Sequence, residues 1–361
     1  MSPIDQPIAQ PIAEWAQAGP GRHNFSLRVG RARTLLAGDL DTARFAMLAM
    51  AGFAPFRGAL RIDGGEVGDR PPHRRRVALI EPGLGLPASG RVRVTELVAR
   101  AANGRQVVDA ALDAACLTVE EADARLADLG DGARLRVALA RTLVVDNRLL
   151  LLDRVLDALE PAALRAALLA LTSIQSRLDI GVVVATARPA ALLGVPIGVP
   201  EQIAAVVGGR VAQCAPPHTL YDDPVGPAVL NLLGPTNLLQ ARLLEVDPDG
   251  VARCHLPGGS NVEGEVVEPA PAVGGACRID IRPERIALAA GDTLAVDGGL
   301  VGEVLGVSFE GAWATLSVRL TAGGTQLRVR RPAGVPLGRM GIGAEVSLAW
   351  QSHHARVWPA A

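Results

Sequence analysis

Two uninterrupted apolar runs constrain the fold of this chain more than any other feature. They are LLLLD, from Leu149 to Asp153, and GVVVAT, from Gly181 to Thr186. Their length and continuity are typical of strands buried on both faces of a parallel sheet. Between them, Pro161 suits the first turn of a helix that we expect to run to about Arg177. A strand, a helix and a second strand in this order predict an α/β layer architecture.

The pattern continues on both sides of this core segment. FSLRV (25–29) alternates like a strand, and the helical run 41–51 is followed by Gly52, a residue suited to ending a helix. ALRIDGGEV predicts a hairpin with a Gly-Gly turn. Further strands are predicted at 33–36, 77–80, 203–207 and 210–214, and further helices at 95–102, 107–115 and 133–145.

Length and turn spacing predict more than one domain. A chain of 361 residues is too long for most single cores. After about Leu239, short alternating runs are separated by DPDG, LPGG, DGG and AGG, which indicates a small all-β barrel or sandwich. Residues 1–22 are rich in Pro, Gln and Ala and are predicted to form a flexible N-terminal arm. We therefore expect an α/β domain at 23–235 and a β domain at 236–361, with the boundary near Gly234-Pro235.

Composition argues against several classes of function. The net charge of −1 and the 3% content of aromatic residues disfavour a nucleic-acid binder, which needs basic and stacking surfaces. The longest apolar candidate, 144–152, contains Asp146, Asn147 and Arg148, so no direct membrane insertion is expected. The N-terminus lacks the pattern of a secretory signal, which favours a cytoplasmic location.

The cysteines and histidines predict no metal site. No cysteine pair has C-x-x-C spacing, and none lies at zinc spacing with histidine. We expect buried or partly buried thiols in a reducing compartment at Cys116, Cys214, Cys254 and Cys277. The pair His353-His354 and the basic run 73–76 are interpreted as solvated.

Several segments resemble one known family. RVALARTLVVDNRLLLLDRVLDALEP, residues 136–161, resembles the helix, Walker B strand and following loop of an ABC-transporter ATPase. RIDGGEVGDRPPHRRRVALIEP (61–82) resembles the region that leads to its Q-loop. GRVAQCAPPHTLYDDP (209–224) and IRPERIAL (281–288) resemble later segments, the second within the C-terminal TOBE module. The resemblance covers about residues 25–361, and it is strongest to importer subunits of the spermidine/putrescine type.

The resemblance implies an architecture and a set of partners. It implies a P-loop-NTPase-like ABC nucleotide-binding domain at 23–235, with a helical subdomain at about 82–130, followed by an OB-like TOBE barrel. ATP and Mg²⁺ are the cofactors of such a family. The implied partners are membrane permease subunits and a second ABC cassette, identical or different. The implied location is peripheral, on the inner face of the cell membrane.

The phosphate-binding motif of that family, G-x-x-x-x-G-K-[ST], supplies backbone N–H groups, a lysine and a hydroxyl ligand for Mg²⁺. The corresponding stretch here is AGDLDTARF, residues 37–45, in a chain whose 36 basic residues are all arginine. Its degenerate cofactor-binding positions are Gly38, Asp39, Thr42, Ala43 and Arg44. Ala43 stands at the lysine position and Arg44 at the metal-ligand position. Leu40 and Thr42 replace glycines, and Asp39 and Asp41 add negative charge where a phosphate would bind.

The other motifs also lack residues that the family uses to bind and hydrolyse ATP. The Q-loop glutamine corresponds to Glu81, and the switch histidine corresponds to Ala187. Asp153 keeps the Walker B position, but Arg154 replaces the catalytic glutamate and reverses the charge of a general base. Asp153 either retains a metal-ligand role or caps the next loop, and Arg154 pairs with Asp153 or Asp157. The signature LSGGQ corresponds to Leu129, Gly130, Asp131 and Gly132, followed by Ala133.

These replacements predict that no catalytic set is intact and that no cofactor or metal is bound. We therefore expect a catalytically degenerate, non-hydrolysing cassette that serves an importer as scaffold or regulator. The first alternative is an active ATP-hydrolysing subunit of a polyamine-type importer. The second is a module that senses a small ligand through its C-terminal barrel.

Overall fold

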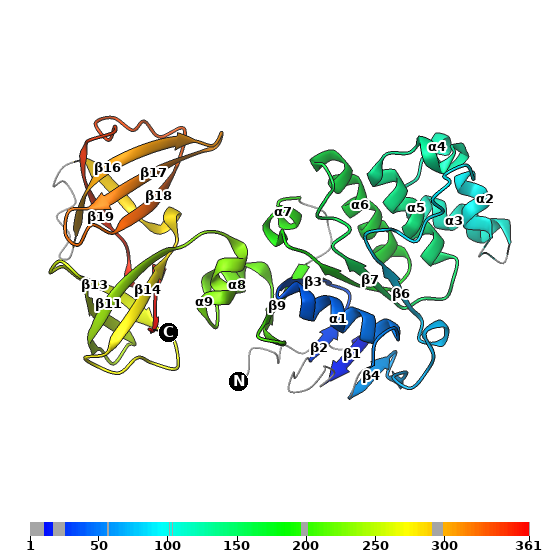
Figure 1. The fold of residues 1–361 in the computed structure, drawn as a ribbon, viewed down its shortest axis with the longest axis horizontal. Coiled ribbons are helices and arrows are strands. Elements are labelled where there is room, and N and C mark those ends of the chain that lie inside the picture. Colours follow the sequence, from blue (N-terminus) through cyan, green and yellow to red (C-terminus); the bar gives the residue numbers. More distant parts are fainter. Residues whose placement is uncertain are drawn as a thin grey trace. The chain divides into compact units, whose positions relative to one another are not determined.

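The chain divides into two compact units, which meet in sequence between Pro224 and Val225. The computed structural model describes residues 11–16, 26–55, 58–100, 102, 104–195, 201–290 and 299–360. Figure 1 shows an α/β unit followed by a β unit. The division comes earlier than the predicted boundary at Gly234-Pro235. Residues 225–234 contact the rest of the second unit, where the guanidinium of Arg282 donates to the carbonyl oxygens of Leu230 at 3.0 Å and Gly234 at 3.4 Å.

A six-stranded sheet forms the centre of the first unit. Its strand order is β10-β9-β3-β8-β7-β6, and all neighbours are parallel except β10 and β9. The bounds are β3 Arg33–Gly38, β6 Val77–Ile80, β7 Leu149–Asp153, β8 Gly181–Ala185, β9 Glu201–Val207 and β10 Arg210–Ala215. Every residue of β7 and β8 is buried, as their continuous apolar runs predict.

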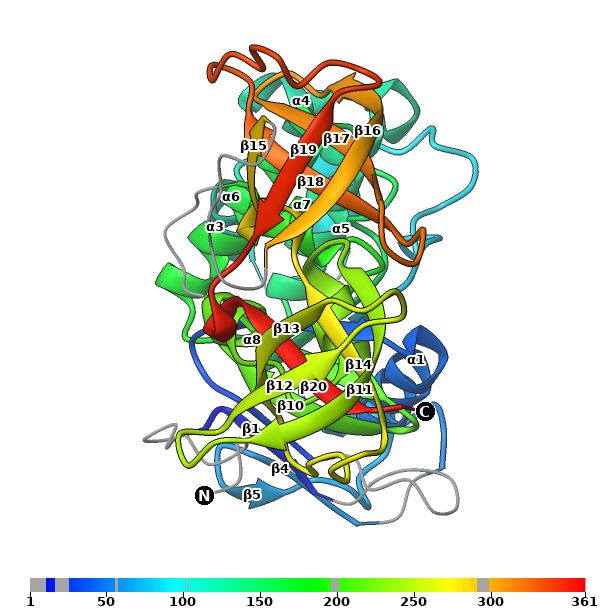
Figure 2. The ribbon, with the colours of Figure 1, turned by 90° about the vertical axis from the view of Figure 1, so that its left-hand side faces the viewer.

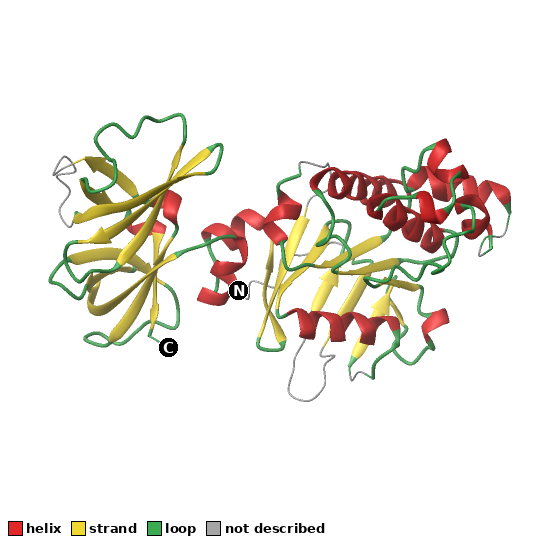
Figure 3. Ribbon diagram, turned by 45° about the horizontal axis from the view of Figure 1, so that its top comes forward, coloured by secondary structure: helices red, strands yellow, loops and turns green. Residues whose placement is uncertain are grey.

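Helices lie on both faces of this sheet, as Figure 3 shows. Their bounds are α1 Leu40–Ala51, α2 Val94–Ala99, α3 Arg105–Ala114, α4 Val119–Asp123, α5 Asp131–Leu143, α6 Pro161–Arg177, α7 Pro189–Leu193 and α8 Pro217–Asp222, with short 3-10 turns at Pro72–Arg74 and Leu126–Asp128. The predicted helix 161–177 is confirmed as α6, with a proline in its first turn. Helices α2 to α4 fall within the range 82–130 expected for the helical subdomain.

A second, antiparallel sheet has the order β2-β1-β4-β5. Its strands are β1 Ala13–Ala16, β2 Leu27–Val29, β4 Ala59–Ile62 and β5 Gly65–Glu66. The predicted arm, 1–22, therefore contains a strand, because Ala13 and Trp15 alternate inward in AEWA. Its residues 1–10 and 17–22 lie outside the described residues. The β4–β5 turn also differs from the Gly-Gly prediction, since Asp63 and Gly64 take the two positive φ values, 50° and 74°.

Both sheets and α1 share one hydrophobic core. Arg75 closes this core at the end of α1, because its Nη1 donates to the carbonyl oxygens of Ala49 at 2.7 Å and Met50 at 3.2 Å. Its Nη2 donates to the carbonyl oxygen of Gly68 at 2.6 Å. The interpretation of the basic run 73–76 as solvated is thus wrong for Arg75, which is buried. Burial lowers the pKa of this guanidinium.

The second unit contains a closed barrel and a second five-stranded sheet, seen in Figure 2. The barrel has the order β11-β12-β13-β20-β14, with bounds β11 Asn237–Val246, β12 Val251–His255, β13 Asn261–Val266, β14 Ala276–Ile281 and β20 Ala355–Pro359. The other sheet has the order β15-β19-β16-β17-β18, with bounds β15 Ala287–Ala290, β16 Leu300–Phe309, β17 Trp313–Leu320, β18 Gln326–Pro332 and β19 Glu345–Ala349. Short helical segments are α9 Pro227–Leu230, Asn231–Leu233, Pro283–Arg285 and Ser352–His354. The predicted barrel is confirmed, and the second sheet is additional to it.

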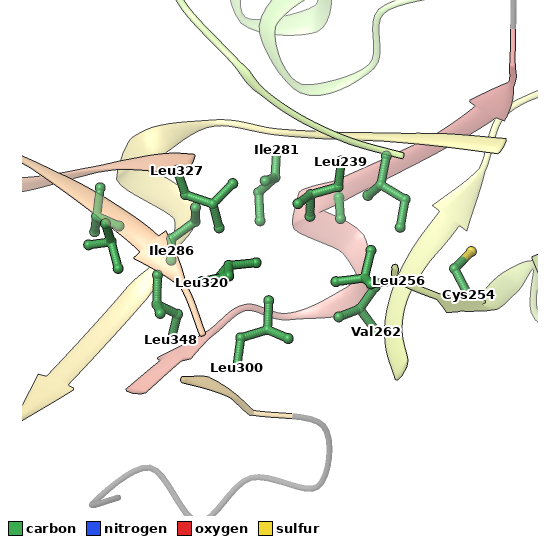
Figure 4. Packing of buried hydrophobic residues seen from close by; sticks show 14 of the residues in the cluster. Leu239, Cys254, Leu256, Val262, Ile281, Ile286, Leu300, Leu320, Leu327 and Leu348 are labelled. Carbon is green, nitrogen blue, oxygen red and sulfur yellow. The ribbon is translucent and has the colours of Figure 1, made fainter. Parts of the chain in front are cut away.

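One apolar cluster connects the two sheets of the second unit, as Figure 4 shows for Leu239 of the barrel and Leu348 of the other sheet. Asn237 joins them through its side chain, which donates to the carbonyl oxygen of Arg328 at 2.8 Å and accepts from its N–H at 2.7 Å. Cys254 and Cys277 are buried in this cluster, with their Sγ atoms 3.8 Å apart.

Cys116 is exposed, contrary to the expectation of a buried or partly buried thiol, and lies in the turn after α3 with a φ of 53°. Within the described ranges, no cluster of three or more His, Cys, Asp or Glu side chains could hold a metal ion. No helix in those ranges combines the length and apolar character needed to span a bilayer.

Replacing Arg75 by Met should destabilise the protein by about 3 kcal/mol, because four backbone carbonyls lose a charged donor. Urea unfolding would measure the loss. The control is Arg74→Met, which changes an exposed neighbour in the same run and should alter stability by less than about 0.5 kcal/mol. Equal effects of the two substitutions would contradict the role given to Arg75.

Candidate functional site

The candidate site lies where the parallel strands of the six-stranded sheet end. Asp39 follows β3, Glu81 follows β6, and Ala187 comes two residues after the end of β8. Asp153 is the last residue of β7 and Arg154 comes next. The carboxyl ends of neighbouring parallel strands meet at one edge of a sheet, which is where ligands bind in open α/β folds.

The connection from β3 to α1 is a single residue, Asp39. Gly38 before it has a φ of 106°, and a Cβ atom there would lie 2.3 Å from the carbonyl oxygen of Val206. The N–H of Asp39 donates to the same oxygen at 2.9 Å. Leu40 and Thr42, at the glycine positions of the motif, belong to α1. The segment that would wrap a phosphate is therefore largely helical.

The carboxylate of Asp39 caps the N-terminus of α1. Its Oδ1 accepts from the N–H of Thr42 at 3.0 Å, and its Oδ2 accepts from the hydroxyl of Thr42 at 2.7 Å. These hydrogen bonds hold the pKa of Asp39 below its ordinary value. Helix N-termini attract anions through their exposed N–H groups and dipole. Here a carboxylate of the chain itself occupies that position.

The lysine position of the motif faces the core. Ala43 has no exposed surface and belongs to the hydrophobic cluster beneath the sheet. A lysine at this position would have to extend its ammonium group out of an apolar environment. Asp41, in the same first turn, is exposed.

Arg44 connects two other motif positions. Its Nη2 donates to Glu81 Oε1 at 2.8 Å, and its Nη1 lies 3.2 Å from Asp153 Oδ2. On the other side, the Nε of Arg154 donates to Asp153 Oδ1 at 3.0 Å. Asp153 is 1% exposed, so two guanidinium groups compensate one buried carboxylate. The structure thus brings four predicted site residues together as one charge cluster.

Of the two partners considered for Arg154, the carboxylate that it hydrogen-bonds is Asp153, and this contact raises the pKa of the arginine. Asp157 binds the segment after β8 instead. Its Oδ1 accepts from the hydroxyl of Thr186 at 2.6 Å, and its Oδ2 accepts from the N–H of Ala187 at 2.8 Å. Thr186 has no exposed surface. We did not predict this contact, and a hydroxyl at the end of the apolar run GVVVA was its only signal in the sequence.

The signature-like residues lie on another element, the start of α5. Gly130 is the N-cap, Asp131 is the first helical residue, and both are exposed. Gly132 is buried, and a Cβ atom there would lie 2.8 Å from the Cβ of Ala163. The glycine at 132 therefore permits close packing of α5 on α6.

The donor set at the strand edge differs from that of a magnesium–phosphate site. Mg²⁺ requires near-octahedral oxygen ligands at short distances. Here both oxygens of Asp153 face guanidinium groups, and Arg44 stands at the position predicted for the hydroxyl ligand. The residues present do not fit the metal complex that the resemblance implies.

Comparison with known proteins identifies relatives along most of the chain. Residues 279–358 match the family described as TOBE domain. Over 348 residues the chain is 31% identical to Spermidine/putrescine import ATP-binding protein PotA 2 of Pseudomonas aeruginosa, and the match covers 91% of each protein. Over 364 residues it is 29% identical to Spermidine/putrescine import ATP-binding protein PotA of Frankia alni, covering 94% of this chain and 75% of that protein.

Solved structures match the first unit in fold. A nucleotide-free ATP-binding cassette from an ABC transporter has a TM-score of 0.52 at 12% identity, covering 62% of this chain and 98% of that one. The structure of cbiO1 from Clostridium perfringens, part of the ABC transporter complex cbiONQ, has a TM-score of 0.51 at 18% identity, covering 59% and 92%. The fold is therefore an ABC nucleotide-binding domain followed by a TOBE domain.

Replacing Asp39 by Ala should cost about 1 kcal/mol at neutral pH, because α1 loses its N-cap acceptor. Asp39→Asn keeps an acceptor and removes only the charge. Since the pKa of Asp39 is lowered in the folded state, its charge stabilises the fold above the ordinary value of 3.8, and this contribution is lost as the pH falls through the folded value.

The free energy of unfolding of wild type, measured with urea, should exceed that of Asp39→Asn by an amount that decreases as the pH falls from about 5 to about 2. The matched control is Asp41→Asn, an exposed acid in the same turn. A difference between wild type and Asp39→Asn that does not change with pH would contradict the capping role of the charge.

Proposed function

The chain belongs to the family of spermidine/putrescine import ATP-binding proteins, and from this premise we propose that it is a non-hydrolysing cassette subunit of an ABC importer. Membership rests on 31% identity over 91% of both proteins. The finer proposal concerns what this particular chain does within such an importer. Its role is that of a scaffold or regulator that occupies the position of a cassette.

One observation carries the proposal. Arg154 stands where a general base would have to accept a proton from the attacking water, and its Nε donates to the buried carboxylate of Asp153. An arginine stays protonated in proteins and has no acceptor atom, so it cannot serve as that base. Glu81 does not replace it, because its carboxylate is paired with Arg44 at 2.8 Å.

The proposed partners follow from the family. We assign the permease-contacting surface to the helical region that contains α2, α3 and α4, and the second cassette to another copy of the chain or to an intact relative. Docking to the permease would place the chain on the inner face of the membrane. The relatives are named for spermidine and putrescine, which makes polyamines the proposed cargo class of the importer.

An active ATP-hydrolysing subunit is the second candidate. The observation that favours it is the similarity itself, which extends over 91% of a relative named as an import ATP-binding protein. Hydrolysis would require Arg44 and Arg154 to leave Asp153, and another group to act as base. A ligand-sensing role of the barrel is a third hypothesis, for which a thermal-shift screen of the full chain against oxyanions and polyamines is the test.

Calorimetric titration of the full chain with millimolar Mg-ATP should give no binding heat. The reason is that Asp39 caps the helix N-terminus and Arg44 occupies the space beside Asp153. An intact relative, measured in the same buffer, provides the positive control. Sub-millimolar binding together with steady phosphate release would favour the active subunit and reject the proposal.

A mixture with an intact cassette tests the signature-like loop separately. In a mixed dimer this chain would present Asp131 toward the ATP of its partner, and a carboxylate there repels phosphate. We expect this chain to leave the ATPase rate of the intact partner unchanged or to lower it. Acceleration of the ATPase rate of the partner by wild type would contradict the expectation that the loop is inert. Equal acceleration by Asp131→Ser would contradict the repulsive role given to Asp131.

A further inference from the structure

The contacts of Arg44 define a cation position in the first unit. Its guanidinium lies between the carboxylates of Glu81 and Asp153, at 2.8 Å and 3.2 Å. These two acids come from the ends of β6 and β7, while Arg44 comes from the first turns of α1. One positive group thus joins three elements that are distant in sequence.

We infer that Arg44 is a built-in cation that takes the place of a divalent metal ion at this strand edge. Such a substitute rests on the proposed function, since a cassette that works without Mg-ATP still has to neutralise Asp153. A guanidinium keeps its charge throughout the physiological pH range and needs no ligand from solution. The edge formed by α1, β6 and β7 is therefore held in one charge-balanced arrangement independently of nucleotide.

Burial makes the cation necessary. Asp153 is 1% exposed, and an ionised carboxylate in such a position is costly unless it is paired. Arg154 donates a hydrogen bond to Oδ1 at 3.0 Å, whereas Arg44 forms an ion pair with Oδ2 at 3.2 Å and Oδ2 accepts no hydrogen bond from the described residues. Arg44 and Glu81 are themselves 40% and 45% exposed, so a cation from solution could reach this position if the guanidinium were absent.

Removing the guanidinium should therefore allow a divalent cation to bind at this position. Arg44→Thr leaves the carboxylates of Glu81 and Asp153 without their shared cation and adds a hydroxyl oxygen beside them. Carboxylate and hydroxyl oxygens are ligands that hard divalent cations accept. Mn²⁺ is a suitable probe, because its paramagnetism allows direct measurement of the bound fraction.

The experiment uses the full chain. In EDTA, Arg44→Thr should unfold about 4 to 8 °C below wild type, because a buried carboxylate loses one of its two partners. Added Mn²⁺ should restore at least half of that loss. Electron paramagnetic resonance should show Mn²⁺ binding at least about tenfold tighter than to wild type. Arg100→Thr, which removes an exposed pair with Glu96, is the matched control and should show neither effect.

Two results would overturn the inference. One is an Arg44→Thr variant as stable as wild type with no response to Mn²⁺, and the other is equal Mn²⁺ binding by variant and wild type. If Arg44→Thr does not fold, the double variant Arg44→Thr, Asp153→Asn should fold, because the buried charge is also removed. Added Mn²⁺ should not change the stability of this double variant. A double variant that is no more stable than the single one would equally overturn it.

The same measurements separate this inference from the proposed function. Binding of Mg-ATP by wild type would reject the non-hydrolysing subunit, whatever Mn²⁺ does to the variant. Absence of ATP binding by wild type, with no Mn²⁺ response of Arg44→Thr, would leave the proposed function standing and remove only the role of Arg44 as a substitute cation.

Discussion

The buried carboxylate of Asp153 is the constraint on which the strand edge of the first unit depends. It ends β7, a strand with no exposed residue, and an ionised group in that position requires compensation by nearby positive charge. Arg154 and Arg44 provide it from two directions. Because Arg44 also binds Glu81, the position of α1 against β6 and β7 depends on the same charge.

A second constraint acts between the end of β3 and the start of α1. Gly38 is the last residue of β3, where a Cβ atom would collide with the carbonyl oxygen of Val206, and α1 begins after one further residue. Asp39 then satisfies donors at the helix N-terminus that an external anion would otherwise meet. The first turns of α1 thus carry a capping carboxylate, Asp39, and an arginine, Arg44, that pairs with Glu81 and Asp153.

The elements that sequence reasoning located well are those whose signal is local. Strands β7 and β8 are continuous apolar runs, and α6 begins at a proline, so their bounds follow from neighbouring residues. The second sheet of the β unit was not predicted, because its pairing and the closure of the barrel by β20 join residues far apart in the chain. β1 was missed for the same reason, since AEWA gains its neighbours only from β2 and β4.

For the candidate site, too, the sequence gives the identity of the residues but not the contacts that they make. The sequence placed Ala43, Arg44 and Arg154 at positions where the ABC pattern has other chemistry, but the ion pair from Arg44 to Glu81 spans 37 residues and is set by the fold. At a buried position such as Arg75, an arginine donates to four backbone carbonyls with one side chain. An ammonium group has too compact a geometry to span such a set. The arginine-only composition explains why a basic residue is arginine rather than lysine. It does not explain Ala43, which is buried in the hydrophobic core. Ala43 and Arg44 are adjacent residues of one helix, and the first lies in the core whereas the second pairs with acids at the strand edge.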